Sequence, residues 1–352
     1  MTMILQPSRI DIAGTARATS STGATHPHGE VDLLRTIVPH PAAARPRVAV
    51  LVPCHNEAAA IAKVVRDFRD ALPGATVYVY DNNSTDDTVL EAHGAGAVVR
   101  HEARQGKGHV VRRMFADIEA DAYVLVDGDD TYEADAAPHM LERLIAGQLD
   151  MVSAARCSSG RTAYRRGHRL GNSLLSGMVV RAFGSGVSDM LSGYRVLSRR
   201  FVKSFPALSA GFETETELTV HALALNMPLA EVQARYRPRG AGSSSKLHTF
   251  RDGLRILRAI VMLIQQERPL QVFSICSAAL CAVGLGLGMP LIVYFVQTGL
   301  VPRTPTAVLS TGLMLLASLS LVSGLILDAV ARGKKEFKRL AYLAIPAPGG
   351  TP

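Results

Sequence analysis

Apolar residues alternate between strand-like and helix-like spacing along the chain from residue 47 onward. The run 47–52 (Arg-Val-Ala-Val-Leu-Val) ends at Pro53 and is typical of a strand buried on both faces. The next apolar residues recur at the spacing of one helix face, namely Ile61, Val64, Val65, Phe68 and Leu72. Further strands are expected at 76–80, 97–99, 122–126 and 150–155, and a helix is expected to start near Gly108. The alternation predicts an α/β domain with a mostly parallel, doubly wound sheet, whose ligands bind at the carboxyl ends of the strands.

Two long segments near the C-terminus contain no Asp, Glu, Lys or Arg. They cover residues 272–296 and 306–327, which are 25 and 22 residues long. As helices they would extend roughly 37 and 33 Å, compared with about 30 Å for the hydrocarbon core of a bilayer. The segments predict a transmembrane hairpin at 270–331, with a pair of buried core helices as the alternative. Because only Arg303 lies in the connection 297–305 and the other basic residues gather outside the hairpin, the large domain and the C-terminus are expected in the cytoplasm.

An amphipathic helix is expected directly before the hairpin. Its apolar stripe consists of Phe250, Leu254, Leu257, Val261 and Ile264, and arginines at 251, 255 and 258 flank it. Such a helix can lie in the lipid headgroup layer, pack on the globular domain, or do both. The predicted organisation is a flexible leader (1–45), a globular domain (46–248), the amphipathic helix (249–269), the hairpin (270–331) and a basic cytoplasmic tail (332–352).

The charge of the chain supports a membrane location. With 38 Lys and Arg against 30 Asp and Glu, the formal net charge is +8, which suits either a nucleic acid or an anionic membrane surface. Much of the excess lies in the last hundred residues, beside the apolar segments, so a membrane is expected and a nucleic acid partner is not. The four cysteines form no Cys-x-x-Cys pair, which argues against a disulfide scaffold and against a structural zinc site.

Acidic and amide side chains follow three of the predicted strands. They occur in the segments 53–57 (PCHNE), 81–87 (DNNSTDD) and 127–130 (DGDD), which a parallel sheet brings to one edge. The segment 81–87 alone could be a turn and a helix cap. The carboxylates at 127–130 repel one another unless a cation lies among them, and Mg²⁺ or Mn²⁺ prefers such oxygen ligands. A divalent ion there would neutralise a diphosphate leaving group, and Lys107, at the start of a predicted helix, adds a further anion contact.

Together these segments resemble the family 2 inverting glycosyltransferases, which have the GT-A fold. The resemblance is carried by 53–57, 81–87, Gly106-Lys107-Gly108 and the pair Asp127-x-Asp129. Three later segments, 189–195 (DMLSGYR), 212–215 (FETE) and 239–246, are similar to dolichyl-phosphate mannose synthases and to bacterial polyprenyl-phosphate glycosyltransferases, many of which have two C-terminal membrane helices. The resemblance spans roughly residues 47–331. It implies a Rossmann-like GT-A domain that uses a nucleotide sugar, Mg²⁺ or Mn²⁺, and a polyprenyl phosphate.

The resemblance also implies roles for individual residues. The residues expected to bind the nucleotide sugar are Pro53, Glu57, Asp81, Asn83, Lys107, Asp127 and Asp129. The residues expected to hold the acceptor phosphate are Arg239, Ser245 and Lys246. The catalytic candidates are Asp129, Asp189 and Arg156, of which the arginine matches a family position near the phosphates.

The metal ligands implied by the resemblance are Asp127 and Asp129, the DxD pair of the family. Asp129 would meet the ion on the diphosphate. Many relatives carry Gln two residues after the second aspartate, where this chain has Thr131. The third protein ligand is therefore open, with Asp130 as a candidate.

The expected acceptor makes a strong general base unnecessary. A phosphomonoester has a second pKa of about 6, so a polyprenyl phosphate is already anionic near pH 7 and can attack the anomeric carbon directly. Catalysis then depends on positioning and on stabilisation of the phosphate charges. Asp189 is the best candidate if a base is used; otherwise it is a structural partner of Arg195 or of another arginine. Of the alternating Glu213, Glu215 and Glu217, one is expected to reach the site and the others to be solvated.

The predicted activity is inverting transfer of a sugar from a UDP- or GDP-sugar to an undecaprenyl- or dolichyl-type phosphate at the cytoplasmic face of the plasma membrane. A glycosyltransferase with another lipid or glycan acceptor is the alternative. Processive polysaccharide synthases of the family share a Gln-x-x-Arg-Trp motif, which a chain without tryptophan lacks. A membrane-tethered protein that binds or flips sugar nucleotides without turnover is a third hypothesis, and a homo-oligomer is compatible with all three.

Overall fold

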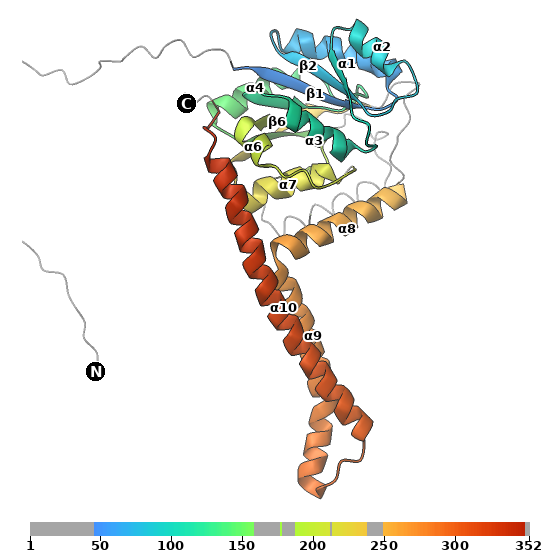
Figure 1. Ribbon diagram of the computed structural model, residues 1–352, viewed down its shortest axis with the longest axis vertical. Coiled ribbons are helices and arrows are strands. Elements are labelled where there is room, and N and C mark those ends of the chain that lie inside the picture. Colours follow the sequence, from blue (N-terminus) through green and yellow to red (C-terminus); the bar gives the residue numbers. More distant parts are fainter. Residues whose placement is uncertain (1–45, 158–176, 178–186, 212, 238–248, 349–352) are drawn as a thin grey trace, which may run out of the picture. The chain divides into compact units, whose positions relative to one another are not determined.

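The computed structural model describes residues 46–157, 177, 187–211, 213–237 and 249–348. The predicted leader 1–45 lies outside these residues. The first elements are β1 (Val48–Cys54), α1 (Ala58–Ala71), β2 (Thr76–Asp81), α2 (Thr88–Gly94), β3 (Val98–His101), α3 (Lys107–Asp117), β4 (Ala122–Leu125), α4 (Ala136–Ala146) and β5 (Met151–Cys157). They are followed by β6 (Arg195–Ser198), α6 (Arg199–Ser204), α7 (Thr214–Leu225), β7 (Leu229–Arg235), α8 (Thr249–Glu267), α9 (Pro269–Thr298) and α10 (Thr304–Leu343), as Figure 1 shows.

A seven-stranded sheet forms the centre of the globular domain, in the order β3-β2-β1-β4-β6-β5-β7. β1 pairs in parallel with β2 and β4, β2 with β3, and β5 with β7, while β6 is antiparallel to both β4 and β5. The predicted α/β class with a mostly parallel sheet is confirmed. Because β1, β2 and β4 are parallel neighbours, the loops that follow Cys54, Asp81 and Leu125 meet at one edge of the sheet.

Helices cover both faces of the sheet. On β1, Val50 and Val52 pack into a core with α1 and α4, whereas Ala49 and Leu51 pack into a second core with α3, α6 and α7. Residues of β1 are therefore buried on both sides, which explains its uninterrupted apolar run. The domain has three layers, and the predicted strands begin and end within two residues of their expected bounds.

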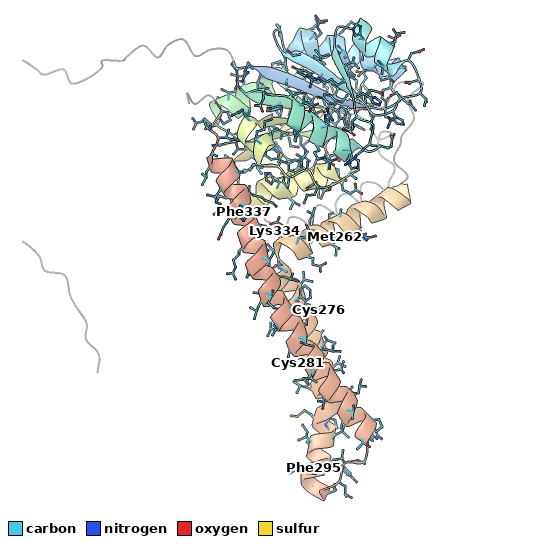
Figure 2. The ribbon with its side chains drawn as sticks, in the orientation of Figure 1. Met262, Cys276, Cys281, Phe295, Lys334 and Phe337 are labelled. Atoms are coloured by element: carbon cyan, nitrogen blue, oxygen red, sulfur yellow. The ribbon has the colours of Figure 1, made fainter. Side chains whose placement is uncertain are left out.

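The helices α9 and α10 are long enough and apolar enough to cross a membrane. Their large apolar side chains point outward: Val296 is 78% exposed, and Figure 2 labels Cys276 and Phe295 among the exposed residues of α9. Within the described residues, α9 and α10 are therefore not buried in the core of the globular domain, which was the alternative expected from the sequence. α10 continues past the end of the apolar run at Leu327 as far as Leu343, so the first part of the predicted basic tail is helical.

Small residues line the contact between α9 and α10. A Cβ on Gly288 would lie 2.5 Å from the Ser310 hydroxyl oxygen. The same hydroxyl donates to the Gly284 carbonyl at 2.8 Å, and the Ser277 hydroxyl donates to the Ala317 carbonyl at 2.8 Å. Glycine and serine at a helix contact allow close approach and are typical of helices packed within a bilayer.

The amphipathic helix α8 packs on the globular domain. Ile260 is fully buried in an apolar cluster with Met190 and with Val220 of α7. On the same helix, Val261 and Met262 are about half exposed, and Figure 2 labels Met262. Of the expected arrangements, the structure shows packing on the domain, and the outer side of the helix still carries apolar side chains.

Candidate active site

The loops after β1 and β2 are tied to each other. The backbone nitrogen of Asn56 donates to the Ser84 hydroxyl at 2.8 Å, and the side-chain oxygen of Asn56 accepts from the backbone nitrogen of Thr85 at 2.7 Å. Pro53 lies in the last part of β1, and Glu57 is buried at the start of α1. The structure therefore brings the segments 53–57 and 81–87 to one rim, as the topology predicts.

Asp81 ends β2 and is buried at this rim. Its carboxylate accepts from the Ser84 amide at 3.2 Å and contacts Nδ1 of His101 at 3.1 Å. Asn83 has a left-handed backbone (φ 63°), and its side-chain nitrogen donates to the Ala103 carbonyl at 2.9 Å. Both predicted residues thus connect β2 to the loop that leads into α3.

Asn82 lies between these two residues, and its side chain makes three hydrogen bonds to that loop. Its side-chain nitrogen donates to the carbonyls of Glu102 and Arg104, both at 2.8 Å, and its side-chain oxygen accepts from the Gly106 amide at 2.7 Å. The Asn82 side chain is buried, so these contacts fix the loop in place. Nothing in the sequence pattern distinguishes Asn82 from Asn83 next to it.

The glycines on either side of Lys107 allow another segment to cross the start of α3. A Cβ on Gly106 would lie 2.3 Å from the Ala210 carbonyl oxygen, and a Cβ on Gly108 would lie 2.1 Å from that of Ser209. Gly106 also has a φ of 133°, which side chains disfavour. The motif Gly-Lys-Gly therefore has a steric reason in addition to any role in anion binding.

Glu217 of α7 holds the crossing segment. Its two carboxylate oxygens accept from the amide nitrogens of Leu208 and Ser209, each at 2.9 Å. The expectation that this glutamate is solvated is wrong, because Glu217 is buried. Backbone amides donate to its carboxylate and take the place of the water molecules that would surround an exposed glutamate.

Lys107 lies between two carboxylates. Its Nζ donates to Oδ1 of Asp127 and to Oε1 of Glu215, both at 2.5 Å. The side chains of Lys107 and Glu215 are 10% and 8% exposed. Burial alone would lower the pKa of Lys107, but the charges of Asp127 and Glu215 raise it well above its usual value. The lysine therefore stays protonated, and Glu215 is the glutamate of the 212–215 segment that reaches the site.

The second aspartate of the DxD pair is held by its neighbour. Asp129 is buried, and its Oδ1 accepts from the Thr131 hydroxyl at 2.6 Å. Thr131 thus orients the carboxylate. Asp130 forms an ion pair with Lys63 of α1 at 2.7 Å, which ties it to α1.

The two aspartates fit a divalent cation that brings further ligands with it. Within the described ranges, no group of three or more His, Cys, Asp and Glu side chains is arranged to hold a metal ion. Mg²⁺ commonly uses one or two carboxylates and completes its shell with water and substrate phosphates. A Cβ on Gly193 would lie 2.2 Å from Oδ2 of Asp127, so the carboxylate can take this position only because residue 193 is glycine. The residues present therefore suit a metal ion bound together with a diphosphate.

Arg156 of β5 forms a two-pronged ion pair with Asp189. Its Nε donates to Oδ2 at 2.6 Å, and its Nη2 donates to Oδ1 at 2.8 Å. Burial alone would raise the pKa of the Asp189 carboxyl, but the hydrogen bonds and charge of Arg156 lower it below the usual value. Of the two expected roles for Asp189, the contacts favour the structural partner of an arginine, and that arginine is Arg156.

Arg195, which the sequence offered as one possible partner of Asp189, contacts backbone carbonyls instead. It is fully buried, and its guanidinium donates to the backbone carbonyls of Met190, Ser192 and Glu215 at 2.8–3.1 Å. Burial lowers the pKa of Arg195 to about 10, although nearby carboxylates oppose the shift. Arg195 therefore joins the 190–192 loop to the start of α7, a role that no spacing in the sequence reveals. The three residues predicted for the acceptor phosphate, Arg239, Ser245 and Lys246, lie outside the described residues.

Comparison with known proteins shows a likeness to glycosyltransferases. Residues 49–205 match the family model described as Glycosyl transferase family 2. The glycosyltransferase AglJ of Haloferax volcanii is 35% identical over 243 residues, which cover 69% of this chain and 80% of the relative. A dolichyl-phosphate hexose transferase of the same organism is 28% identical over 221 residues, covering 63% and 95%.

A solved structure shares the fold. Glucosyl-3-phosphoglycerate synthase from Mycobacterium tuberculosis, in complex with Mn²⁺, UDP and glucosyl-3-phosphoglycerate, superposes with a TM-score of 0.52 at 21% identity. The match covers 62% of this chain and 80% of the synthase. At this identity the likeness concerns the fold.

Proposed function

The chain belongs to glycosyltransferase family 2, and on that premise we propose that it transfers a sugar from a nucleotide sugar to a polyprenyl phosphate at a membrane surface. The proposal includes a divalent metal ion bound with the donor. It also places α9 and α10 across the membrane and the globular domain on the cytoplasmic side, where the excess of Lys and Arg lies.

One observation carries the proposal: the site is connected to the apolar hairpin through the contact between α7 and α8. α7 carries Glu215, which binds Lys107, and its Val220 packs on Ile260 of α8. α8 leads directly into α9 at Arg268. These contacts connect the site to the apolar hairpin, an arrangement that suits an acceptor whose tail is dissolved in the bilayer. The relative named as a dolichyl-phosphate hexose transferase supports an acceptor of this kind.

The donor side of the proposed site uses the rim of the sheet. Pro53, Glu57, Asp81 and Asn83 would contact the nucleoside, because they lie at the ends of β1 and β2 or just after them, at the edge where such folds bind ligands. Lys107 adds a protonated amine beside Asp127. When bound, a divalent ion at Asp127 and Asp129 would neutralise the charge that develops on the nucleoside diphosphate as it leaves.

The acceptor side depends on Arg156. Its guanidinium would stabilise phosphate charge, and Asp189 would hold it at the correct angle, which makes Asp189 a positioning residue. Arg239, Ser245 and Lys246 are proposed to hold the acceptor phosphate. Because that phosphate is itself the nucleophile, no side chain has to remove a proton from it above pH 6 or so.

Product formation tests the proposed function. The purified full-length protein, reconstituted in lipid nanodiscs, is incubated with Mg²⁺, undecaprenyl phosphate and a panel of radiolabelled UDP- and GDP-sugars. We expect one donor to give labelled lipid, and undecaprenol, the matched acceptor without phosphate, to give none. If diacylglycerol, supplied in place of undecaprenyl phosphate, gives as much labelled lipid, the acceptor is a different lipid. No labelled lipid with any donor would refute the proposal.

The pH dependence of an Asp189→Asn variant separates a positioning role from a base. The lowered pKa means that the Arg156–Asp189 pair stabilises the fold above the unfolded carboxyl pKa of about 3.9 and loses this contribution as the pH falls through the folded value. Between pH 6 and 9 Asp189 stays ionised, so it adds no limb to the rate profile. We expect the variant to lower kcat/KM by about 10–100-fold at every pH in this range, because Arg156 loses one prong of its support. The acceptor phosphate, with a second pKa of about 6, gives an acidic limb that the variant should keep. If the substitution removed an acidic limb, Asp189 would titrate in this range and act as a base.

A further inference from the structure

The second apolar helix continues well beyond its uncharged segment. The apolar run of α10 ends at Leu327, and the helix continues to Leu343 through a stretch that contains Lys334 and Phe337, both labelled in Figure 2. Tyr342 lies 15 residues beyond Leu327, which corresponds to about 22 Å along a helix. Residues 328–343 of α10 therefore extend beyond the part of the helix that is apolar enough to lie in the bilayer, and we call them the arm.

The end of this arm is bonded to a buried acidic group of the globular domain. The Tyr342 hydroxyl donates to Oδ2 of Asp150 at 2.8 Å, and the Arg200 guanidinium lies over the Tyr342 ring, 4.7 Å from its centroid. Asp150 is fully buried, pairs with Arg200 and accepts from the Ser198 hydroxyl at 2.7 Å. The tyrosine thus completes a hydrogen-bonded network inside the domain.

A second contact joins the arm to α8. Lys338 of α10 lies 2.8 Å from Glu267, the last residue of α8, and the two side chains are 24% and 16% exposed. α8 is itself fixed to the domain through Ile260. The arm therefore contacts the globular domain both directly and through α8.

These contacts lie at the opposite end of a strand from the proposed acceptor side. Asp150 immediately precedes β5 (Met151–Cys157), and Arg156 is near the end of the same strand. At about 3.3 Å per residue, the six positions between them span roughly 20 Å. A tilt of the domain about one attachment would move Arg156 relative to the bilayer, whereas two attachments oppose that movement.

We propose that the end of α10 is a strut that sets the height and tilt of the globular domain above the membrane, with Tyr342 as its main positioning residue. The inference rests on the proposed function, because only a bilayer-dissolved acceptor needs this geometry. Without the strut, the domain is attached through the α8–α9 junction at Arg268 and can rotate there. With it, the domain is held before the acceptor arrives, so less orientational freedom has to be lost in the reaction.

Two acceptors of different length test the strut in one preparation. The full-length protein in nanodiscs is assayed with undecaprenyl phosphate in the bilayer and with farnesyl phosphate supplied from solution. Tyr342→Ala is expected to lower kcat/KM for the bilayer acceptor by about tenfold, mainly through KM, and to leave the soluble acceptor within about twofold. Tyr342→Phe, which keeps the ring over Arg200, should lose less. The matched control is Phe337→Ala, whose side chain is 76% exposed on the same helix, and it should change neither acceptor.

Hydrogen exchange of the last turns of α10 gives a readout that does not depend on turnover. In the wild type, amides near residue 342 should be protected, and Tyr342→Ala should speed their exchange about tenfold while Phe337→Ala does not. The strut would be overturned if Tyr342→Ala lowered kcat/KM equally for both acceptors or did not lower it for the bilayer acceptor. It would also be overturned if the amides near residue 342 were unprotected in the wild type. If the wild type transfers sugar to neither acceptor, the proposed function fails, and the exchange data alone decide whether the strut exists.

Discussion

Replacement of Asp129 by asparagine is expected to lower kcat by roughly 10²–10³-fold, the size found when one preorganised electrostatic contact to a transition state is lost. Asparagine has nearly the same shape and can still accept from the Thr131 hydroxyl, which contacts Oδ1 at 2.6 Å, so the fold should be kept. What is lost is the negative charge that a divalent ion requires. Initial rates over a series of Mg²⁺ and Mn²⁺ concentrations should show a higher requirement for the ion as well as the lower maximum.

Asp130→Asn is the matched control, because it removes a neighbouring carboxylate with different contacts. Asp130 pairs with Lys63, which is 46% exposed, and surface pairs of this kind contribute about 0–1 kcal/mol. We expect the Asp130 variant to keep its activity within about threefold. Binding of Mn²⁺ in the presence of UDP, followed by electron paramagnetic resonance, should weaken in the Asp129 variant and not in the Asp130 variant. The reverse order would make Asp130 the ligand and would contradict the assignment made here.

The edge of the sheet was predictable because its signals are local. β1, β2 and β4 are apolar runs that end at Cys54, Asp81 and Leu125, and parallel strands bring their carboxyl ends together without any knowledge of side-chain contacts. The first helix has one apolar face, so its period is visible in the sequence. The rim that carries the residues proposed to bind the nucleotide sugar could therefore be located from the order of these elements.

α7 could not be interpreted in the same way. It is buried on all sides, and its buried residues include Glu215, Glu217 and His221. A helix without a solvent face has no amphipathic period, and its acidic residues look like solvated ones. The contact between Glu215 and Lys107 joins residues 108 positions apart, so no local pattern contains it. The same reason hides Arg195, whose partners are backbone carbonyls, and the end of α10, where a run of basic residues resembles a solvated tail.

Lys107→Met is expected to affect both stability and turnover. The substitution leaves Asp127 and Glu215 without the cation that bridges them, and loss of one partner from a buried charged cluster costs about 3–5 kcal/mol. Lys63 provides a matched control, because it also bridges two carboxylates, Asp67 and Asp130, but is exposed. Lys63→Met should cost no more than about 1 kcal/mol. Thermal unfolding of the detergent-solubilised protein should show the difference as a far larger fall in Tm for the Lys107 variant.

The double variant Lys107→Met/Glu215→Gln separates the structural part of this effect from the catalytic part. Removing the Glu215 charge takes away the repulsion with Asp127, so most of the lost stability should return. Turnover should stay about 10²-fold below the wild type, because the protonated amine beside the proposed diphosphate position is still missing. If turnover recovers with stability, Lys107 serves only to neutralise Glu215. If Lys107→Met costs no more than Lys63→Met, Lys107 and Glu215 are not buried in solution, and the role assigned to Lys107 on the donor side is wrong.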